Sequence, residues 1–489
     1  MKDTMLETVL PESVGVSSKA VLDYINKMEE RGVNLHSFLM MRQGKICAEG
    51  YWEPYSEEKL QRMYSISKTF TSAAIGLLLD EGKIGLHDKI ADYFPEYLPS
   101  NPHPYILDIE IEDMLKMAVA FTETNHTDKS EHWVKDFFNA APSHPSGTMF
   151  RYDTSASHTL CALVEKLTGM KMLDYMYERF LRHLGFSKDA WCIEGPDGYS
   201  WGGSGVVATL RDLAKFASVF LNEGKFNGRQ LISREYVKKA TSRQLDLDVF
   251  YGTFWTDYGY QIWILKNGGF AFRGMGSQHA ICFPKEDFLF CCTADNQGTP
   301  LCDFLIYEEL INHFIPTLKE EKLEENEYCI KLKEKCKNLR LSVQKGNKTS
   351  VVQEKINGKV YELEDNPMGI SSLSFSFMGD EGTMCYKTPR GDKELKFGFG
   401  KHVEYLFPET HYYYERIAKP SGKKYRAISS AAWTEEDKLV IRTHTIDEFL
   451  GNITMSFSFK DKEIGVLMLK NAEWFFEEYH GYAGGSIMN

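Results

Sequence analysis

Apolar side chains at helical spacing mark residues 63–82, the most distinctive stretch of the chain. The apolar positions recur every third or fourth residue, as in a helix with a buried face, and Gly82 follows the last apolar turn as a stop signal. The pattern therefore predicts a mostly buried helix that opens on Ser65. The apolar positions are Ile66, Phe70, Ala73, Ala74, Leu77 and Leu78.

Helical and strand patterns alternate through the rest of the first 318 residues. A helical pattern covers residues 11–31, and two apolar runs within 38–51 flank a polar turn that predicts a β-hairpin. From the Ser65 helix to about residue 190 the pattern is mainly helical. The apolar runs of residues 270–293 predict a further hairpin in a central sheet.

The composition changes after residue 318, where a run of Lys and Glu begins. We expect a domain boundary here, with a first domain over residues 1–318 and a charged linker over 319–345. Residues 346–489 contain short alternating segments between turns, a pattern typical of an all-β domain. The tail at 480–486 is expected to be loosely ordered.

Composition and charge limit the classes of function. The formal charge of −12 argues against a general binder of nucleic acid or anionic membranes, because both need a basic surface. The N-terminal segment lacks the apolar core of a secretory signal, and no apolar run approaches the length of a membrane span. The ten cysteines show no Cys-x-x-Cys pair and no metal spacing. We therefore expect a cytoplasmic protein with no metal, cofactor, nucleic-acid partner or membrane partner.

Ser65 and Lys68 are the strongest candidates for chemistry. Their spacing places both side chains on one face of the predicted helix, with the hydroxyl at its electropositive start. A desolvated lysine can take the proton of a serine hydroxyl and so create a nucleophile. The same Ser-x-x-Lys spacing begins at Ser56, Ser342 and Ser421, none of which opens an apolar helix. On this segment alone, an N-cap serine on a core helix explains Ser65 equally well.

Three further segments carry candidate site residues. Tyr152 follows a Pro-Ser-Gly turn, and a tyrosine beside a lysine and a serine can shuttle a proton, although most of the 26 tyrosines must serve packing. The glycines of residues 274–276 let the backbone approach a ligand, and an N–H group there could pair with that of Ser65 in an oxyanion hole. The aromatic residues of 250–265 could line an apolar pocket or serve only core packing.

These motifs, in this order over residues 10–316, resemble the serine β-lactamase and penicillin-binding-protein superfamily. The likeness is greatest to its class C-like esterases, D-aminopeptidases and related amide hydrolases. The nucleophile motif is matched by Ser65-Ile66-Ser67-Lys68, and the tyrosine motif by residues 150–154. The third residue of the tyrosine motif is usually Asn, but here it is Thr154. Residues 202–213 resemble the glycine turn and following helix of the family.

The third motif of the family, Lys-Thr-Gly or His-x-Gly, is degenerate in this chain. The best registration is Phe272-Arg273-Gly274, with the second oxyanion donor at the N–H of Met275. A shift by two residues would move that donor to Ser277. The family's lysine or histidine contacts the carboxylate of a β-lactam, and Arg273 could replace it if its side chain points inward. We therefore favour ester or amide hydrolysis over efficient β-lactam destruction.

The resemblance implies both a fold and a mechanism. The fold class is α+β, with a helical region beside an antiparallel sheet flanked by helices and the site at their junction. The mechanism is acylation of Ser65, with Lys68 and Tyr152 sharing the general-base and general-acid duties. The oxyanion hole would consist of the backbone N–H groups of Ser65 and Met275. The second domain resembles the lipocalin-like β-barrel appended to some hydrolases of this superfamily.

The resemblance also implies substrate contacts from Thr154, Arg273 and Gly274, with a small-molecule ester, amide or lactam as the partner. A weak β-lactamase or a D-aminopeptidase is the nearest alternative, and a homo-oligomer is compatible with the sequence. Two alternatives of another class are a sensor that is acylated once and a pseudoenzyme scaffold. A Ser-His-Asp hydrolase is disfavoured because no Gly-x-Ser-x-Gly elbow is present. We therefore interpret His144, His158 and His279 as structural.

Overall fold

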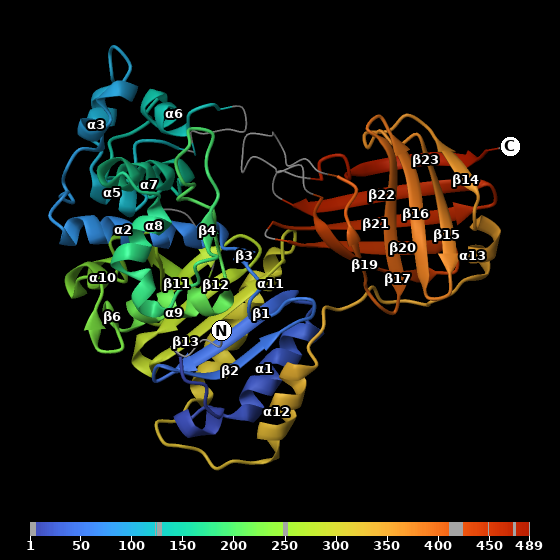
Figure 1. Cartoon of the computed structure of the whole chain (residues 1–489), viewed down its shortest axis with the longest axis horizontal. Helices are drawn as coiled ribbons and strands as arrows, with labels where there is room; N and C mark the ends of the chain where they lie inside the picture. The colour runs from blue at the N-terminus through green and yellow to red at the C-terminus, as the bar shows by residue number, and fades with distance from the viewer. Residues whose placement is uncertain are drawn as a thin grey trace. The chain divides into compact units, whose positions relative to one another are not determined.

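An eight-stranded antiparallel sheet forms the centre of the first of two compact units in the computed structural model (Figure 1). The units comprise residues 1–340 and 341–489. The hairpins predicted within 38–51 and 270–293 both belong to this sheet. In sheet order the strands are β2 (Lys45–Tyr51), β1 (Leu35–Arg42), β13 (Phe288–Ala294), β12 (Gln278–Phe283), β11 (Phe270–Gly274), β10 (Trp263–Leu265), β9 (Trp255–Tyr258) and β8 (Leu245–Asp246). The structure describes residues 6–122, 124, 130–247, 253–409, 424–447, 449–472 and 476–488.

Helices cover both faces of this sheet. On one face the ring of Phe272 in β11 contacts aromatic rings of α9 (Leu210–Leu221). On the other face Tyr24 of α1 (Ser18–Glu30) packs edge-on against Phe290 of β13. The segment expected as a charged linker contains α12 (Glu327–Lys337), which packs beside α1 within the first unit.

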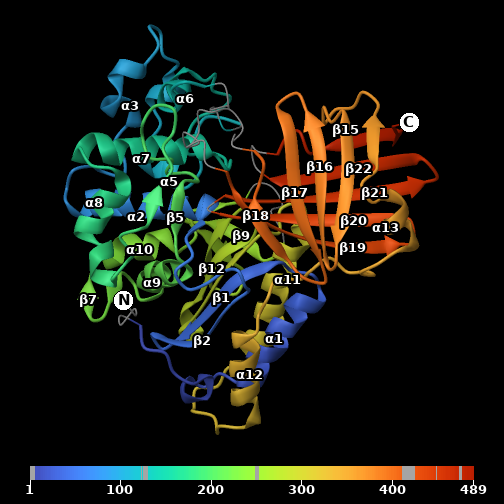
Figure 2. The ribbon, with the colours of Figure 1, turned by 45° about the vertical axis from the view of Figure 1, so that its right-hand side comes forward.

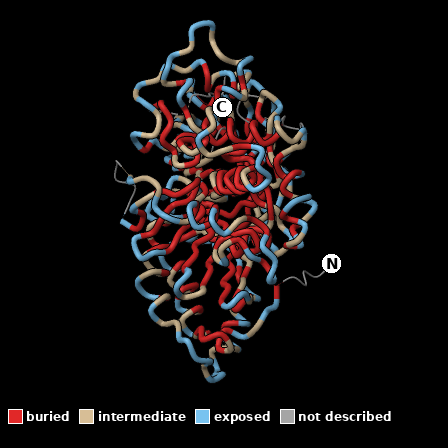
Figure 3. Tube along the Cα trace, turned by 90° about the vertical axis from the view of Figure 1, so that its left-hand side faces the viewer, coloured by how far each residue is buried: buried red, intermediate tan, exposed pale blue. Residues whose placement is uncertain are grey.

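The helix predicted after Ser65 is α2 (Ser67–Asp80), and it is buried from Ser67 to Leu78. One face of α2 packs on α7 (Thr154–Thr168) and α8 (Met172–Arg179), while Phe70 stacks on Phe216 of α9 at 3.9 Å between ring centroids. Figure 3 shows how buried residues fill the interior beneath exposed surface loops. The helix thus connects the helical region to the sheet, which places its first turn at their junction.

Shorter elements complete the first unit. They are α3 (Ile90–Tyr93), α4 (Pro104–Leu107), α5 (Ile111–Leu115), α6 (Trp133–Asn139), α10 (Arg234–Ala240), α11 (Pro300–Glu308), the small sheet of β3 (Gln61–Arg62), β5 (Val206–Ala208) and β4 (Trp191–Cys192), and the hairpin of β6 (Lys225–Phe226) and β7 (Arg229–Gln230). Among the described helices, none combines the length and the apolar character that crossing a membrane requires.

The second unit is a closed β-barrel of nine strands (Figure 2). β17 pairs in parallel with β19 to complete the ring, and β18 pairs with residues 426–429 of β19 along the same edge. Aromatic side chains such as Phe375, Trp433 and Phe457 pack in its interior. The helix α13 (Val351–Ile356) precedes the strands. The strands are β14 (Val360–Leu363), β15 (Ser372–Met378), β16 (Glu381–Thr388), β17 (Gly391–Phe399), β18 (Val403–Leu406), β19 (Arg426–Glu435), β20 (Lys438–Ile446), β21 (Leu450–Lys460), β22 (Glu463–Ala472) and β23 (Gly481–Ile487).

The α+β fold of the first unit and the β-barrel of the second confirm the predicted fold class. The expectation of a loosely ordered tail was wrong, because residues 481–487 form β23. This strand pairs with β14 on one side and β22 on the other, so its backbone groups are satisfied within the barrel.

Candidate active site

Ser65 and Lys68 meet at the start of α2. Ser65 lies in a short 3₁₀ turn (Tyr64–Ile66) that leads directly into the helix. The Nζ of Lys68 donates to Ser65 Oγ at 3.1 Å and to the carbonyl oxygen of Gly203 at 2.7 Å. The lysine is only 1% exposed, while Ser65 is half-buried. The structure therefore brings together the hydroxyl and the amine that a serine acyl-transfer site requires.

The backbone before Ser65 is held in an unusual conformation. Tyr64 has a φ of +49°, a left-handed value that side chains other than glycine rarely adopt. Its ring packs against the guanidinium of Arg62 at 4.3 Å, and Arg62 itself is fully buried. Arg62 donates to the carbonyl oxygen and the hydroxyl of Ser204, at 2.8 and 2.9 Å. The strand before Ser65 and the turn that accepts from Lys68 are thus connected by one side chain.

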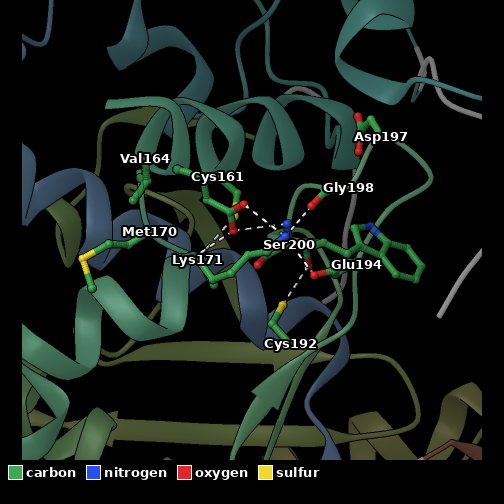
Figure 4. Close-up of polar contacts among 12 residues, drawn as sticks. Cys161, Val164, Met170, Lys171, Cys192, Glu194, Asp197, Gly198 and Ser200 are labelled. Atoms are coloured by element: carbon green, nitrogen blue, oxygen red, sulfur yellow. Dashed lines mark hydrogen bonds and ion pairs between the residues drawn. The ribbon is translucent and has the colours of Figure 1, made fainter. Parts of the chain in front are cut away.

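This turn is also anchored to α7. Glu165 of α7 accepts hydrogen bonds from the backbone N–H groups of Met172 and Ser200, at 2.9 and 3.2 Å. Lys171 pairs with Glu194 at 2.8 Å and donates to the carbonyl oxygen of Gly198 (Figure 4). These contacts hold residues 194–200, which lead into the turn, against the helical region.

Tyr152 lies beside Lys68. The ammonium of Lys68 is 4.9 Å from the centroid of the Tyr152 ring, which stacks on Trp263 of β10 at 5.6 Å and an interplanar angle of 27°. Tyr152 immediately precedes the N-cap of α7, Asp153, which accepts from the N–H of Ser155 at 2.8 Å. Burial raises the pKa of the Asp153 carboxyl, against the opposing effect of its Ser155 hydrogen bonds. The structure thus places Tyr152 beside Lys68 and in the same cleft lining as Ser65, while its role in proton transfer stays a prediction.

The third segment approaches Ser65 from β11, which ends at Gly274. A Cβ on Gly274 would lie 2.3 Å from the carbonyl oxygen of Met63, so only glycine allows this approach. The following hairpin turns at Gly276 and Ser277, both with positive φ. Its Met275 carbonyl accepts from the side chain of Gln278 at 3.0 Å. Phe272-Arg273-Gly274 thus lies on the strand, and its Gly274 brings backbone close to the turn that holds Ser65.

A cleft of about 620 Å³ opens at this junction. Ser65, Tyr152, Arg273, Gly274 and Met275 all line it, whereas Thr154 is absent from its described lining. A Cβ on Gly203 would lie 2.5 Å from Thr154 Cγ2, so Thr154 packs on the glycine turn instead. The other lining residues are Trp255, Trp263, Gly276, Ser277, Asn296, Gln297, Gly298, Thr299, Pro300, Asp303 and Phe304.

Arg273 is held by an ion pair and by two indole rings. Its guanidinium carbon is 3.6 Å from the ring centroid of Trp255 and 4.9 Å from that of Trp263. It donates at 2.6 Å to Asp303 of α11, whose other oxygen is 2.8 Å from His279 Nε2. Burial by itself would raise the pKa of Asp303, but His279 and Arg273 outweigh it and hold that pKa well below its usual range. No local pattern marks Asp303, so the sequence did not reveal it.

His158 and His144 contact residues outside the cleft lining. His158 Nε2 lies 3.1 Å from a carboxylate oxygen of Asp197, and His144 Nδ1 lies 2.7 Å from the hydroxyl of Ser143. Within the described part of the chain, the side-chain hydrogen bond of Ser65 is with Lys68. The described residues also contain no group of three or more His, Cys, Asp or Glu side chains placed to hold a metal ion.

The family model described as Beta-lactamase matches residues 25–290, more than half of the chain. The chain belongs to the beta-lactamase family. This confirms the resemblance found in the sequence motifs. The chain is also 24% identical over 277 residues to the 6-aminohexanoate-dimer hydrolase of Paenarthrobacter ureafaciens. The aligned region covers 51% of this chain and 70% of that relative.

Two solved structures share the fold of this chain. A Bacillus anthracis protein provisionally described as a 6-aminohexanoate-dimer hydrolase is 20% identical with a TM-score of 0.50, covering 63% of this chain and 87% of its own. The structure of SurE is 14% identical with a TM-score of 0.50, covering 90% of this chain and 94% of its own. At these identities the likeness shows the fold of this beta-lactamase family member, and the residues of the cleft must support any statement about its activity.

Proposed function

We propose that this protein is a serine hydrolase that cleaves a small ester or amide through an acyl-enzyme on Ser65. The observation that carries the proposal is the 3.1 Å contact between Lys68 Nζ and Ser65 Oγ at the edge of a cleft that Ser65 lines. Membership of the beta-lactamase family and the likeness to a curated amide hydrolase support it.

In the proposed reaction the substrate carbonyl sits above Ser65, with its oxygen facing the N–H groups of Ser65 and Met275. Lys68 and Tyr152 share the transfer of the serine proton as Oγ bonds to the carbonyl carbon. The two N–H groups stabilise the negative charge that develops on the oxygen. The same proton then protonates the leaving alcohol or amine as the bond to it breaks, which leaves an ester on Ser65.

Deacylation uses the same groups in reverse. A water molecule gives a proton to the Lys68 and Tyr152 pair while its oxygen attacks the acyl carbon, and the pair returns a proton to Ser65 Oγ. Lys68 is buried with its amine 3.1 Å from Ser65 Oγ, so the proposed proton acceptor lies next to the hydroxyl that returns to its protonated form. Arg273 and Gly274 border the substrate in the cleft. Thr154 supports the site indirectly, because it packs against the glycine turn.

The test compares Ser65→Ala with a matched control, Ser56→Ala. Both serines begin a Ser-x-x-Lys sequence, but Ser56 is exposed and opens no apolar helix. With 4-nitrophenyl hexanoate as substrate, we expect Ser65→Ala to lose at least about 10³-fold in kcat/KM and Ser56→Ala to match the wild type. Circular dichroism of each variant verifies the fold. Full activity of a folded Ser65→Ala variant would refute the proposal.

A further inference from the structure

We propose that the cleft selects substrates with an uncharged, apolar acyl group, and that Asp303 sets this selection by neutralising Arg273. The inference rests on the proposed hydrolysis at Ser65 and adds the class of its substrate. It concerns the wall of the cleft that β9, β10, β11 and α11 form together, which we assign to the acyl group of the substrate.

The charge on this wall cancels internally. Arg273 and Asp303 are the charged members of the described lining, and they pair with each other at 2.6 Å. The second oxygen of Asp303 contacts His279 at 2.8 Å, which fixes the carboxylate in place. A substrate carboxylate at Arg273 would lie beside the Asp303 carboxylate, so two half-buried anions would share one cation.

The rest of the wall is aromatic. Trp255, Trp263 and Phe304 line it together with Tyr152 and Pro300. The guanidinium of Arg273 already occupies the indole faces that would attract an ammonium group of a substrate. A charged acyl end of either sign would therefore lose hydration without gaining a free counter-charge. An alkyl or aryl group loses no hydrogen bonds there and gains apolar contact.

The experiment uses three 4-nitrophenyl esters whose acyl chains have the same length: the neutral hexanoate, the anionic monoester of adipic acid and the cationic 6-aminohexanoate. For the wild-type protein we expect kcat/KM for the hexanoate to exceed that for either charged ester by at least about tenfold. Equal or faster turnover of a charged ester would overturn the inference. If none of the esters is turned over in a Ser65-dependent way, the proposed function itself fails.

Asp303→Asn tests the assigned role. The substitution keeps the shape of the side chain but leaves the charge of Arg273 uncompensated, so we expect the adipate to hexanoate ratio to rise about tenfold, while the 6-aminohexanoate to hexanoate ratio falls. The control is Asp189→Asn, which removes the same charge from the chain. Asp189 is exposed and lies outside the cleft lining. An unchanged ratio in a folded Asp303→Asn variant, or the same rise in Asp189→Asn, would refute the role of Asp303. If Asp303→Asn does not fold, the wild-type ester series still decides the selection.

Discussion

Gly274→Ala isolates the close approach of β11 to the nucleophile turn. The added Cβ would lie 2.3 Å from the carbonyl oxygen of Met63, whereas Cβ atoms essentially never come nearer than 3.0 Å to a neighbour. The Cβ is fixed to the backbone of Gly274 and the oxygen belongs to the backbone of Met63, so neither can rotate away. The strand and the turn must therefore separate by at least about 0.7 Å. Misplacement on the scale of about 1 Å costs an enzyme on the order of 10²-fold in rate. Because Met275 follows Gly274 directly, the shift changes the geometry of the proposed oxyanion hole.

We therefore expect Gly274→Ala to lower kcat/KM for 4-nitrophenyl hexanoate by about 10- to 100-fold. Overpacking of this kind destabilises by about 1–3 kcal/mol, which a thermal unfolding scan would detect. The control is Gly465→Ala in β22 of the barrel, where an added Cβ meets nothing within 4 Å. Activity within about threefold of wild type and an unchanged unfolding temperature in Gly274→Ala would refute the reasoning, because the contact would then be relieved without cost.

Three further predictions concern proton transfer and pH. Lys68→Met should lower kcat by about 10²- to 10⁴-fold in steady-state assays with the hexanoate ester. Lys59→Met, in the Ser-x-x-Lys sequence that begins at Ser56, should leave kcat unchanged. Tyr152→Phe keeps the ring stacked on Trp263 but removes the hydroxyl, so kcat should fall by about 10²-fold with little change in KM, and a parallel rise in KM would contradict this. Burial lowers the pKa of His36 to about 3, so below about pH 6.5 the unfolded chain binds more protons than the folded chain. The free energy of unfolding should therefore decrease by up to about 1.4 kcal/mol for each unit that the pH is lowered. His36→Gln should make this fall shallower in urea unfolding measured between about pH 7 and pH 5, and an unchanged slope would exclude His36 as its source.

Local patterning was enough to predict much of the fold. The apolar spacing after Ser65 predicted α2, because a helix buried on nearly all sides still needs its largest side chains at regular intervals. It placed the helix start two residues early, since the left-handed Tyr64 packs on Arg62, and Arg62 is held by Ser204 far along the chain. β23 was missed for a related reason. Its Gly-Tyr-Ala-Gly-Gly sequence has no strand pattern, and its extended form comes from pairing with β14 and β22.

The site was predictable where a motif is local and hidden where it is not. Ser65 and Lys68 share one helical turn, so their spacing alone predicted their contact. Tyr152 was predicted to lie near them only because the motifs stand in the order that the family has. The ion pair between Arg273 and Asp303 joins β11 to α11, which follows two strands later. No pattern in either segment predicts that these two side chains meet. Residues 250–252 of the aromatic segment lie outside the described residues. Residues 253–265 serve both expected purposes, because Trp255 and Trp263 line the cleft while Tyr260 lies in the core.

The most direct test of the account is the identity of the acylated residue. The protein would be treated with a fluorophosphonate probe, and intact-mass spectrometry with peptide mapping would follow. The account predicts a single adduct on Ser65 that is absent from Ser65→Ala and strongly reduced in Lys68→Met, in which the serine lacks its buried amine. An adduct on another residue, or no adduct on the folded protein, would contradict the claim that Ser65 is the nucleophile.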